Sequence, residues 1–260
     1  MAASIKQKRK GTTSAAVMVR RVKTGSVPVL PPQADRKVPS FVTSHVSVRP
    51  LYSGPESSVT ALDDFLAPDE ADAWIAYGET VGFDIAKHPQ SAGIAHRDCG
   101  RLVVDSEDIA GAIFARLKPF LPPTMASCGG GTAWEVDACA SNLRLYKYGR
   151  GQRFGKHYDG SNEVDAERRT FFTVLLYLNG GDAAGRNPKV LEGGHTNFFL
   201  EDGKMPVCSM SPTAGAVLIH EHGDRCLLHE GAAVLAGVKY LLRTDVIYRR
   251  SGKKGSNKHR

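Results

Sequence analysis

Two stretches in the first half of the chain have the features of amphipathic helices. In the first, Pro68 is followed by Asp69 and Glu70, which is typical of the first turn of a helix. Gly78 or Gly82 is expected to end it. The pattern therefore predicts a helix that begins at Pro68.

The second stretch is more regular. Ser106 is placed to cap a helix, and two acidic residues follow it. Pro119 is expected to stop this helix, because proline lacks a backbone N–H. The apolar residues that recur at helical spacing are Ile109, Ile113, Phe114 and Leu117.

Farther along the chain the pattern becomes that of short strands separated by Gly-rich turns. A shorter strand candidate, 59–62, precedes the first helix. The strand candidates of the second half are 142–148, 170–178, 195–200, 216–220 and 239–248. The sequence thus predicts a mainly β (α+β) fold, in which an antiparallel barrel or jelly roll carries flanking N-terminal helices.

Composition divides the chain into a folded domain with two basic ends. We expect a disordered basic arm over 1–56, a folded domain over 57–250 and a basic tail over 251–260. Within the domain, we assign a helical part to 57–125 and the barrel to 135–250. Of the 260 residues, 42% are apolar and 23% charged, which is ordinary for a soluble protein.

The net charge of +7 belongs to the ends of the chain. The first 34 residues hold seven basic residues and no acid, the last 12 hold six and no acid, and the rest is mildly acidic. The run Lys6–Lys10 suits nuclear import. The acid-free start, which contains Arg and Ser, suits an organellar transit peptide instead, and a simple solubilising tail is the third interpretation. No apolar run is long enough to span a membrane, and the five cysteines form no CxxC pair. We expect an intracellular, cytoplasmic or nuclear protein, with an organelle as the alternative.

A candidate metal site begins with His157 and Asp159. Residues two apart in a strand face the same side, so this imidazole and this carboxylate converge. A second imidazole would complete the two-His, one-carboxylate set that leaves positions open on Fe(II). His229 is favoured because it precedes a new strand, and His220 and His222 are the alternatives.

Two cations suit an anionic cosubstrate. Lys239 and Arg243 are four residues apart and therefore lie on the same face of one strand. A buried cation is costly unless it meets an anion, and the far carboxylate of 2-oxoglutarate is such an anion. Asp245 shares the face and is placed to neutralise Arg243.

The candidate metal ligands and the two cations lie in one segment that is similar to a known family. The segment from Asn142 to Tyr248 resembles the iron- and 2-oxoglutarate-dependent dioxygenases of the prolyl 4-hydroxylase type, whose fold is a double-stranded β-helix. The order and spacing of five blocks carry the resemblance: Tyr148–Asp159, Leu176–Asn179, Glu192–Thr196, His229–Gly231 and Gly237–Tyr248.

The resemblance implies the roles of particular residues. It implies that His157, Asp159 and His229 ligate iron. Lys239 takes the place of the residue that binds the far carboxylate of 2-oxoglutarate, with Arg243 kept beside it. Tyr148 and Tyr177 match tyrosines that line the cosubstrate pocket. The implied cofactors are Fe(II), 2-oxoglutarate, O2 and L-ascorbate.

The implied activity is hydroxylation of an unactivated C–H bond with release of succinate and CO2. A prolyl or other protein side chain is the leading substrate, and a small molecule is also compatible. An AlkB-type nucleic-acid demethylase is the alternative, because Arg243 and Arg249 lie six apart and the basic ends suit a polyanion. A non-catalytic binding module and a zinc hydrolase are further alternatives.

Overall fold

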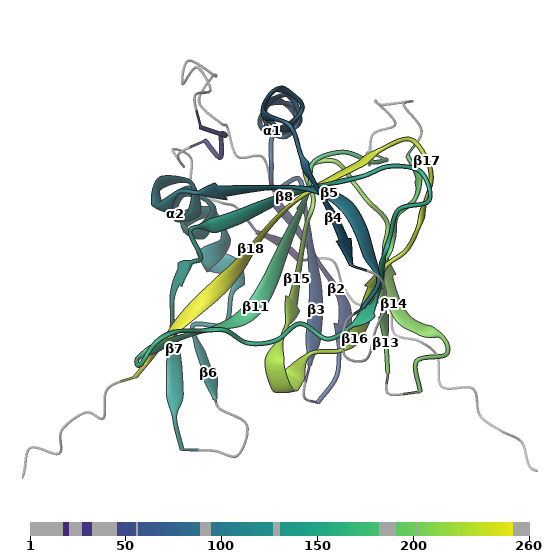
Figure 1. The fold of residues 1–260 in the computed structure, drawn as a ribbon. Coiled ribbons are helices and arrows are strands. Elements are labelled where there is room, and N and C mark those ends of the chain that lie inside the picture. Colours follow the sequence, from purple (N-terminus) through teal and green to yellow (C-terminus); the bar gives the residue numbers. More distant parts are fainter. Residues whose placement is uncertain are drawn as a thin grey trace, which may run out of the picture.

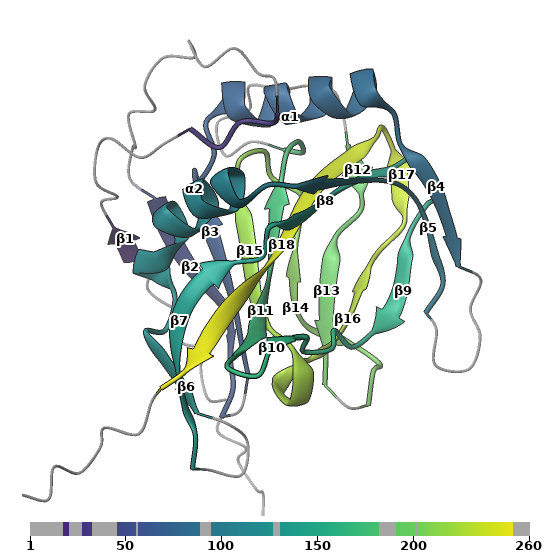
Figure 2. The ribbon, with the colours of Figure 1, turned by 60° about the vertical axis from the view of Figure 1, so that its left-hand side comes forward.

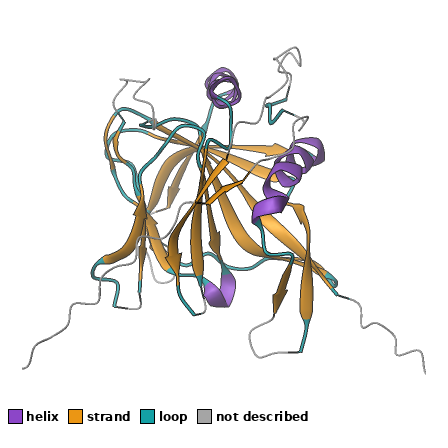
Figure 3. Cartoon of the chain, turned by 180° about the vertical axis from the view of Figure 1, so that it is seen from behind, coloured by secondary structure: helices purple, strands orange, loops and turns teal. Residues whose placement is uncertain are grey.

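The computed structural model describes the backbone of residues 18–20 and 86–88, and residues 28–32, 46–55, 57–85, 95–126, 131–181, 191–200 and 202–251 in full. Within these ranges, the strands far outweigh the helices (Figure 3). No helix in them is long and apolar enough to cross a membrane.

Both predicted helices are present. Helix α1 spans Pro68–Val81, and Gly82 ends it with a positive φ of 95°. Helix α2 spans Glu107–Leu117, and the Ser106 hydroxyl accepts a hydrogen bond from the backbone N–H of Ile109 at 3.3 Å. Two single turns of 3-10 helix, η1 and η2, cover Lys118–Phe120 and Gly223–Arg225.

The strands form one large sheet and one small hairpin. The hairpin pairs β12 (Glu192–Gly193) with β17 (Val234–Ala236). The strands of the large sheet are β1 (Met18–Arg20), β2 (Val46–Ser53), β3 (Ser58–Asp63), β4 (Asp84–His88), β5 (Arg97–Asp105), β6 (Thr124–Ala126), β7 (Ala133–Cys139), β8 (Asn142–Tyr148), β9 (Phe154–His157), β10 (Glu163–Asp165), β11 (Arg168–Tyr177), β13 (Thr196–Phe199), β14 (Pro206–Met210), β15 (Val217–Glu221), β16 (Leu228–Gly231) and β18 (Lys239–Arg250).

The large sheet curls into a barrel. Its main path runs β1-β2-β3-β15-β11-β18-β8-β5-β9-β16-β13-β14, and β14 comes back against β2. One wall contains β3, β15, β11, β18 and β8, while β9, β16, β13 and β14 form the opposite wall (Figures 1 and 2). This is the predicted double-stranded β-helix, built from antiparallel pairs as expected.

The two faces of the main wall have different partners. On β11, Val174 and Leu176 pack with Trp74 of α1 in the core on the helix side. Leu175 and Tyr177, which alternate with them, belong to a second core inside the barrel. The helices therefore cover the outer face, and the inner face is left for the site.

The structure corrects the expected N-terminal boundaries. Residues 46–53 were expected within a disordered arm, but they form β2, which pairs with β3 and buries Val46 and Val48. The alternation is short and is interrupted by Pro50, so its signal in the sequence is weak. The expected helical part, 57–125, likewise contains strands β3 to β6. Most of the rest of the arm, and the tail beyond residue 251, lie outside the described residues.

A buried ion pair joins the two helices. Arg116 of α2 donates to both carboxylate oxygens of Glu70 of α1, at 2.8 and 2.7 Å, and both side chains are buried. Glu70 also accepts hydrogen bonds from the backbone N–H groups of Val29 and Ala67. One carboxylate thus fixes both helices and the segment before β2.

We predict that Glu70→Gln lowers the free energy of unfolding by about 3–5 kcal/mol, because it leaves the buried charge of Arg116 without this carboxylate. Urea denaturation of the full chain measures the change. Asp165→Asn, which removes an exposed partner of Arg168, is the control and should leave the midpoint unchanged. Equal midpoints for the two variants would contradict the assigned role of the pair.

Candidate active site

Two imidazoles and one carboxylate converge at the end of the barrel wall formed by β9 and β16. His157 closes β9, Asp159 follows it by two residues, and His229 lies opposite His157 in β16. His157 Nε2 lies 3.5 Å from Asp159 Oδ1, and His229 Nε2 lies 3.7 Å from Asp159 Oδ2. The donor atoms of the trio all lie within 4.8 Å of one another.

The backbone fixes which nitrogen of each ring is free. The Nδ1 atoms of His157 and His229 donate to the carbonyl oxygens of Gly155, at 2.8 Å, and Leu227, at 2.9 Å. A carbonyl only accepts, so each proton is on Nδ1 and each Nε2 lone pair faces Asp159. Burial lowers the pKa of His229 to about 4, so the ring is neutral. Two imidazoles with free Nε2 lone pairs and a carboxylate fit a divalent iron.

Asp159 is held as an anion. Its carboxylate accepts hydrogen bonds from Thr173 Oγ1 at 2.8 Å and from the guanidinium of Arg243 at 3.2 Å. Burial alone would raise the pKa of Asp159, but the positive charge of Arg243 outweighs it and holds that pKa well below its usual range. The site therefore presents a charged oxygen ligand at neutral pH.

Arg243 is already neutralised. Besides Asp159, its guanidinium contacts Asp245 Oδ1 at 3.2 Å, and Asp245 also pairs with Arg144 at 2.7 Å. Asp245 thus lies beside Arg243, as the strand spacing suggested. The charge of Arg243 serves two buried carboxylates.

Lys239 is in the opposite situation. Its side chain is 3% exposed, and Nζ donates to the carbonyl oxygen of Gly194 at 2.6 Å. Among the described residues no carboxylate pairs with it, and its Nζ lies 5.8 and 5.3 Å from the ring centroids of Tyr148 and Tyr177. Burial lowers the pKa of Lys239 to about 7. An anion bound beside it would relieve this cost.

One cavity joins these groups. It is bounded by the three residues of the metal trio, by Lys239 and Arg243, and by apolar side chains of β11 and β18, Leu175 and Leu241. Tyr148 and Thr196 also line it. Tyr177, which was expected to line the cosubstrate pocket, is not among the residues that line this cavity; its hydroxyl shares a hydrogen bond of 2.7 Å with Thr196 Oγ1.

Comparison with known families identifies this region. Residues 143–244 match the family model of the 2OG-Fe(II) oxygenase superfamily. The segment is a 2OG-Fe(II) oxygenase domain. A domain of this superfamily is a 2-oxoglutarate-dependent iron dioxygenase, which uses Fe(II), 2-oxoglutarate and O2. The predicted family and enzyme class are confirmed.

Several solved structures are similar to the chain. The viral collagen prolyl hydroxylase vCPH of Paramecium Bursaria Chlorella virus-1 is 19% identical, with 74% of this chain and 96% of that chain covered and a TM-score of 0.49. A Pseudomonas putida prolyl-4-hydroxylase is 19% identical, with 75% and 93% covered and a TM-score of 0.46. A Trichoplax adhaerens prolyl hydroxylase in complex with a hypoxia inducible factor peptide is 15% identical, with 72% and 82% covered and a TM-score of 0.47. No curated protein matches the chain.

The oxygenase cavity also contains residues that sequence reasoning missed. The guanidinium of Arg97 lies between the rings of Tyr146 and Phe154, at 4.5 and 4.4 Å, and Phe154 stacks on His157 at 3.6 Å. Arg97 begins β5, and the sequence around it has no clear alternation. Only the pairing of β5 between β8 and β9 brings it to the cavity.

Of the remaining residues that the sequence offered for the site, some line the cavity and others do not. His220 lines the cavity, whereas His222 is buried beside Thr173 and does not. Arg249 lies outside the cavity, where it is largely exposed and pairs with Asp137. The two arginines considered for a demethylase, Arg243 and Arg249, therefore do not act on one ligand.

Removal of the charge of Arg243 and removal of the charge of Lys239 should have opposite effects on the stability of the metal-free enzyme. We predict that Arg243→Met destabilises the metal-free enzyme by about 3–5 kcal/mol, because Asp159 and Asp245 lose their buried partner. Lys239→Met should leave the metal-free enzyme as stable as wild type or more stable, because the unneutralised charge disappears. Chemical denaturation at pH 6.5, where Lys239 is protonated, measures both. If Lys239→Met were destabilised and Arg243→Met were not, Lys239 and not Arg243 would be the cation that compensates the buried carboxylates.

Proposed function

We propose that His157, Asp159 and His229 hold the iron of this dioxygenase and that Lys239 binds the far carboxylate of 2-oxoglutarate. The observation that carries the proposal is one cavity in which two free Nε2 lone pairs and an ionised carboxylate lie at one end and, at the other, a buried cation without a carboxylate partner among the described residues. When bound, the iron supplies the redox chemistry that couples 2-oxoglutarate and O2 to hydroxylation, with succinate and CO2 as products.

The charges of the cavity favour Lys239 as the cosubstrate residue. Arg243 already faces two carboxylates, so a third anion there would gain little and would compete with Asp159. Lys239 faces none among the described residues, and it is too deeply buried for water to solvate its charge. We therefore choose Lys239 over Arg243 for the far carboxylate, and Tyr148 forms the wall beside it.

The rest of the chain orients these groups. The carbonyl groups of Gly155 and Leu227 hold both imidazoles in one tautomer, and Thr173 and Arg243 hold the carboxylate of Asp159 in place. Leu175 and Leu241 exclude water from the path between the metal trio and Lys239.

For the substrate, we propose a protein side chain, with proline as the first candidate and L-ascorbate as the reductant that keeps the enzyme active. The aromatic wall beside His157, formed by Phe154 and Tyr146, suits an uncharged aliphatic ring. The solved prolyl hydroxylases described above act on proline, and one is in complex with a peptide.

Anaerobic spectroscopy tests the metal and cosubstrate assignment. Fe(II) and then 2-oxoglutarate are added to the full chain, and the visible metal-to-ligand charge-transfer band is followed. We expect the band in wild type, its loss in His229→Ala, and no 2-oxoglutarate consumption by His157→Ala or Asp159→Ala. Unchanged consumption by either of the last two variants would overturn the ligand set.

The pH dependence of cosubstrate binding tests Lys239 separately. In the ligand-free protein this amine has a pKa of about 7, and only its charged form attracts a carboxylate. Burial raises the pKa of both neighbouring phenols, Tyr148 and Tyr177, so neither becomes charged near neutral pH. We predict that the Kd of 2-oxoglutarate rises about tenfold between pH 7.5 and 8.5.

The measurement is anaerobic calorimetric titration of the Mn(II)-loaded protein. Lys239→Arg is the matched control, because its charge persists above pH 12 and the profile should become flat. A slope in Lys239→Arg equal to that of wild type would assign the titrating group elsewhere.

Mass spectrometry of the products tests the substrate class. Wild type and Asp159→Ala are incubated with proline-containing peptides and, in parallel, with methylated oligonucleotides. We expect a gain of one oxygen in a peptide with wild type only, together with succinate. Loss of a methyl group from an oligonucleotide, without peptide oxidation, would replace the proposed substrate.

A further inference from the structure

The imidazole of His222 lies close to the metal trio without lining the cavity. It is 4% exposed and follows the last residue of β15. Its Nδ1 lies 3.1 Å from Thr173 Oγ1, and the same hydroxyl donates to Asp159 Oδ2 at 2.8 Å. One hydroxyl group therefore separates this histidine from the carboxylate of the trio.

The direction of each hydrogen bond at this hydroxyl follows from the chemistry of its partners. Asp159 is an anion and only accepts, so the single proton of the Thr173 hydroxyl points to it. The hydroxyl oxygen has two lone pairs, and the guanidinium of Arg243 donates to one of them at 3.2 Å. His222 must then donate to the other lone pair through its Nδ1–H.

The ring of His222 has one proton to give. Burial lowers the pKa of His222, so its imidazole is neutral. Its Nε2 is buried and has no hydrogen-bond partner among the described residues, so no acceptor holds the proton on that side. The tautomer with Nδ1–H satisfies the Thr173 hydroxyl, which then accepts two hydrogen bonds and donates one. The hydroxyl proton is left with a single direction, toward Asp159.

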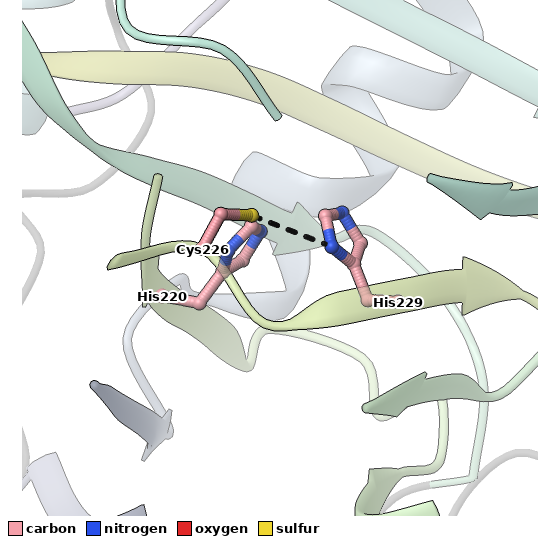
Figure 4. Close-up of side chains that lie close together, drawn as sticks. All are labelled: His220, Cys226 and His229. Carbon is pink, nitrogen blue, oxygen red and sulfur yellow. Dashed lines mark hydrogen bonds between the residues drawn. The ribbon is translucent and has the colours of Figure 1, made fainter. Parts of the chain in front are cut away.

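The turn that begins at His222 also holds the main chain of Asp159. The backbone N–H of Gly223 donates to the carbonyl oxygen of Asp159 at 2.8 Å, and the thiol of Cys226 accepts the backbone N–H of Asp159 at 3.2 Å. Figure 4 shows Cys226 beside the trio, with its sulfur 3.8 Å from His229 Nδ1. One turn thus contacts Asp159 on both sides of its backbone.

The backbone of this turn fixes the place of the His222 ring. The N–H of His222 donates to the carbonyl oxygen of Phe171 at 3.0 Å, two residues before Thr173 on β11. Gly223 has a φ of 69°, and a Cβ on it would lie 3.1 Å from the Cβ of Ser161. Glycine therefore suits this position, and it allows the chain to turn directly after His222.

We propose that His222 is a positioning residue for the metal site and that it acts on the carboxylate of Asp159 through the hydroxyl of Thr173. The proposal rests on the proposed metal site. The hydrogen bond from His222 keeps the Thr173 proton on Asp159, and this holds the carboxylate in one orientation for the metal.

Metal binding to the full chain tests this without any activity measurement. Mn(II) affinity is measured by titration calorimetry for wild type, Thr173→Val and His222→Leu. We expect each variant to weaken Mn(II) binding about tenfold, because a hydrogen bond that orients a metal ligand has been lost. His96→Gln is the control and should match wild type, since His96 pairs with Asp98 and does not line the cavity. Wild-type affinity in folded His222→Leu would overturn the proposal.

Conservative variants distinguish hydrogen bonding from packing. Thr173→Ser keeps the hydroxyl, and His222→Asn keeps an N–H donor near the place of Nδ1. We expect both to bind Mn(II) more tightly than Thr173→Val and His222→Leu. If His222→Asn bound as weakly as His222→Leu, the ring would act by packing alone and the proposal would fail. If His222→Leu does not fold, His222→Met takes its place.

The double variant Thr173→Val/His222→Leu tests whether His222 acts through Thr173. Residues that act through one hydrogen-bond chain are not additive, so the double variant should bind Mn(II) no more weakly than Thr173→Val alone. Losses that multiply in the double variant would show that His222 acts independently of the hydroxyl, which contradicts the proposal.

The ligand variants separate this proposal from the one on which it rests. If wild type binds Mn(II) and His157→Ala does not, the trio stands and only the role of His222 is being judged. If wild type binds no metal, the proposed metal site fails, and the role proposed for His222 fails with it.

Discussion

The charge of one buried carboxylate, Asp159, constrains the whole site. It lies inside the barrel, where an unpaired anion would be protonated or would destabilise the fold. Arg243 compensates it from β18, Thr173 donates to it from β11, and His157 and His229 face it from β9 and β16. These residues belong to both walls of the barrel, so the carboxylate joins the walls at the point where the metal trio forms.

Strand β18 carries two buried cations, Lys239 and Arg243, whose charges are compensated in different ways. Alternation along β18 points Lys239, Leu241, Arg243 and Asp245 into the barrel. Arg243 has a planar group that reaches two carboxylates at once, and it is fully engaged. Lys239 is a point charge whose one hydrogen-bond partner in the described part of the chain is a carbonyl group, so it keeps its capacity for an anion. This division is physically sensible, because the residue that fixes the metal ligand is separate from the one that exchanges a cosubstrate.

Much of this arrangement could be predicted from the sequence, and the exceptions have physical reasons. Ser106 and Pro68 marked both helices, because caps and first-turn residues act locally. The spacing of His157 and Asp159 indicated convergence, because a strand fixes the faces of its residues. Arg97 and the strand 46–53 were missed, because their places depend on pairing with distant strands. The choice between Lys239 and Arg243 also stayed open in the sequence, since it depends on which carboxylates the fold brings near each cation.

The most direct test of the central claim is a crystal structure of the full chain grown anaerobically with Mn(II) and 2-oxoglutarate. The account predicts metal density between His157, Asp159 and His229, and the far carboxylate of 2-oxoglutarate within hydrogen-bond distance of Lys239 Nζ. It also predicts that the pairing of Arg243 with Asp159 is retained. A far carboxylate bound to Arg243, or a metal held away from Asp159, would contradict the account.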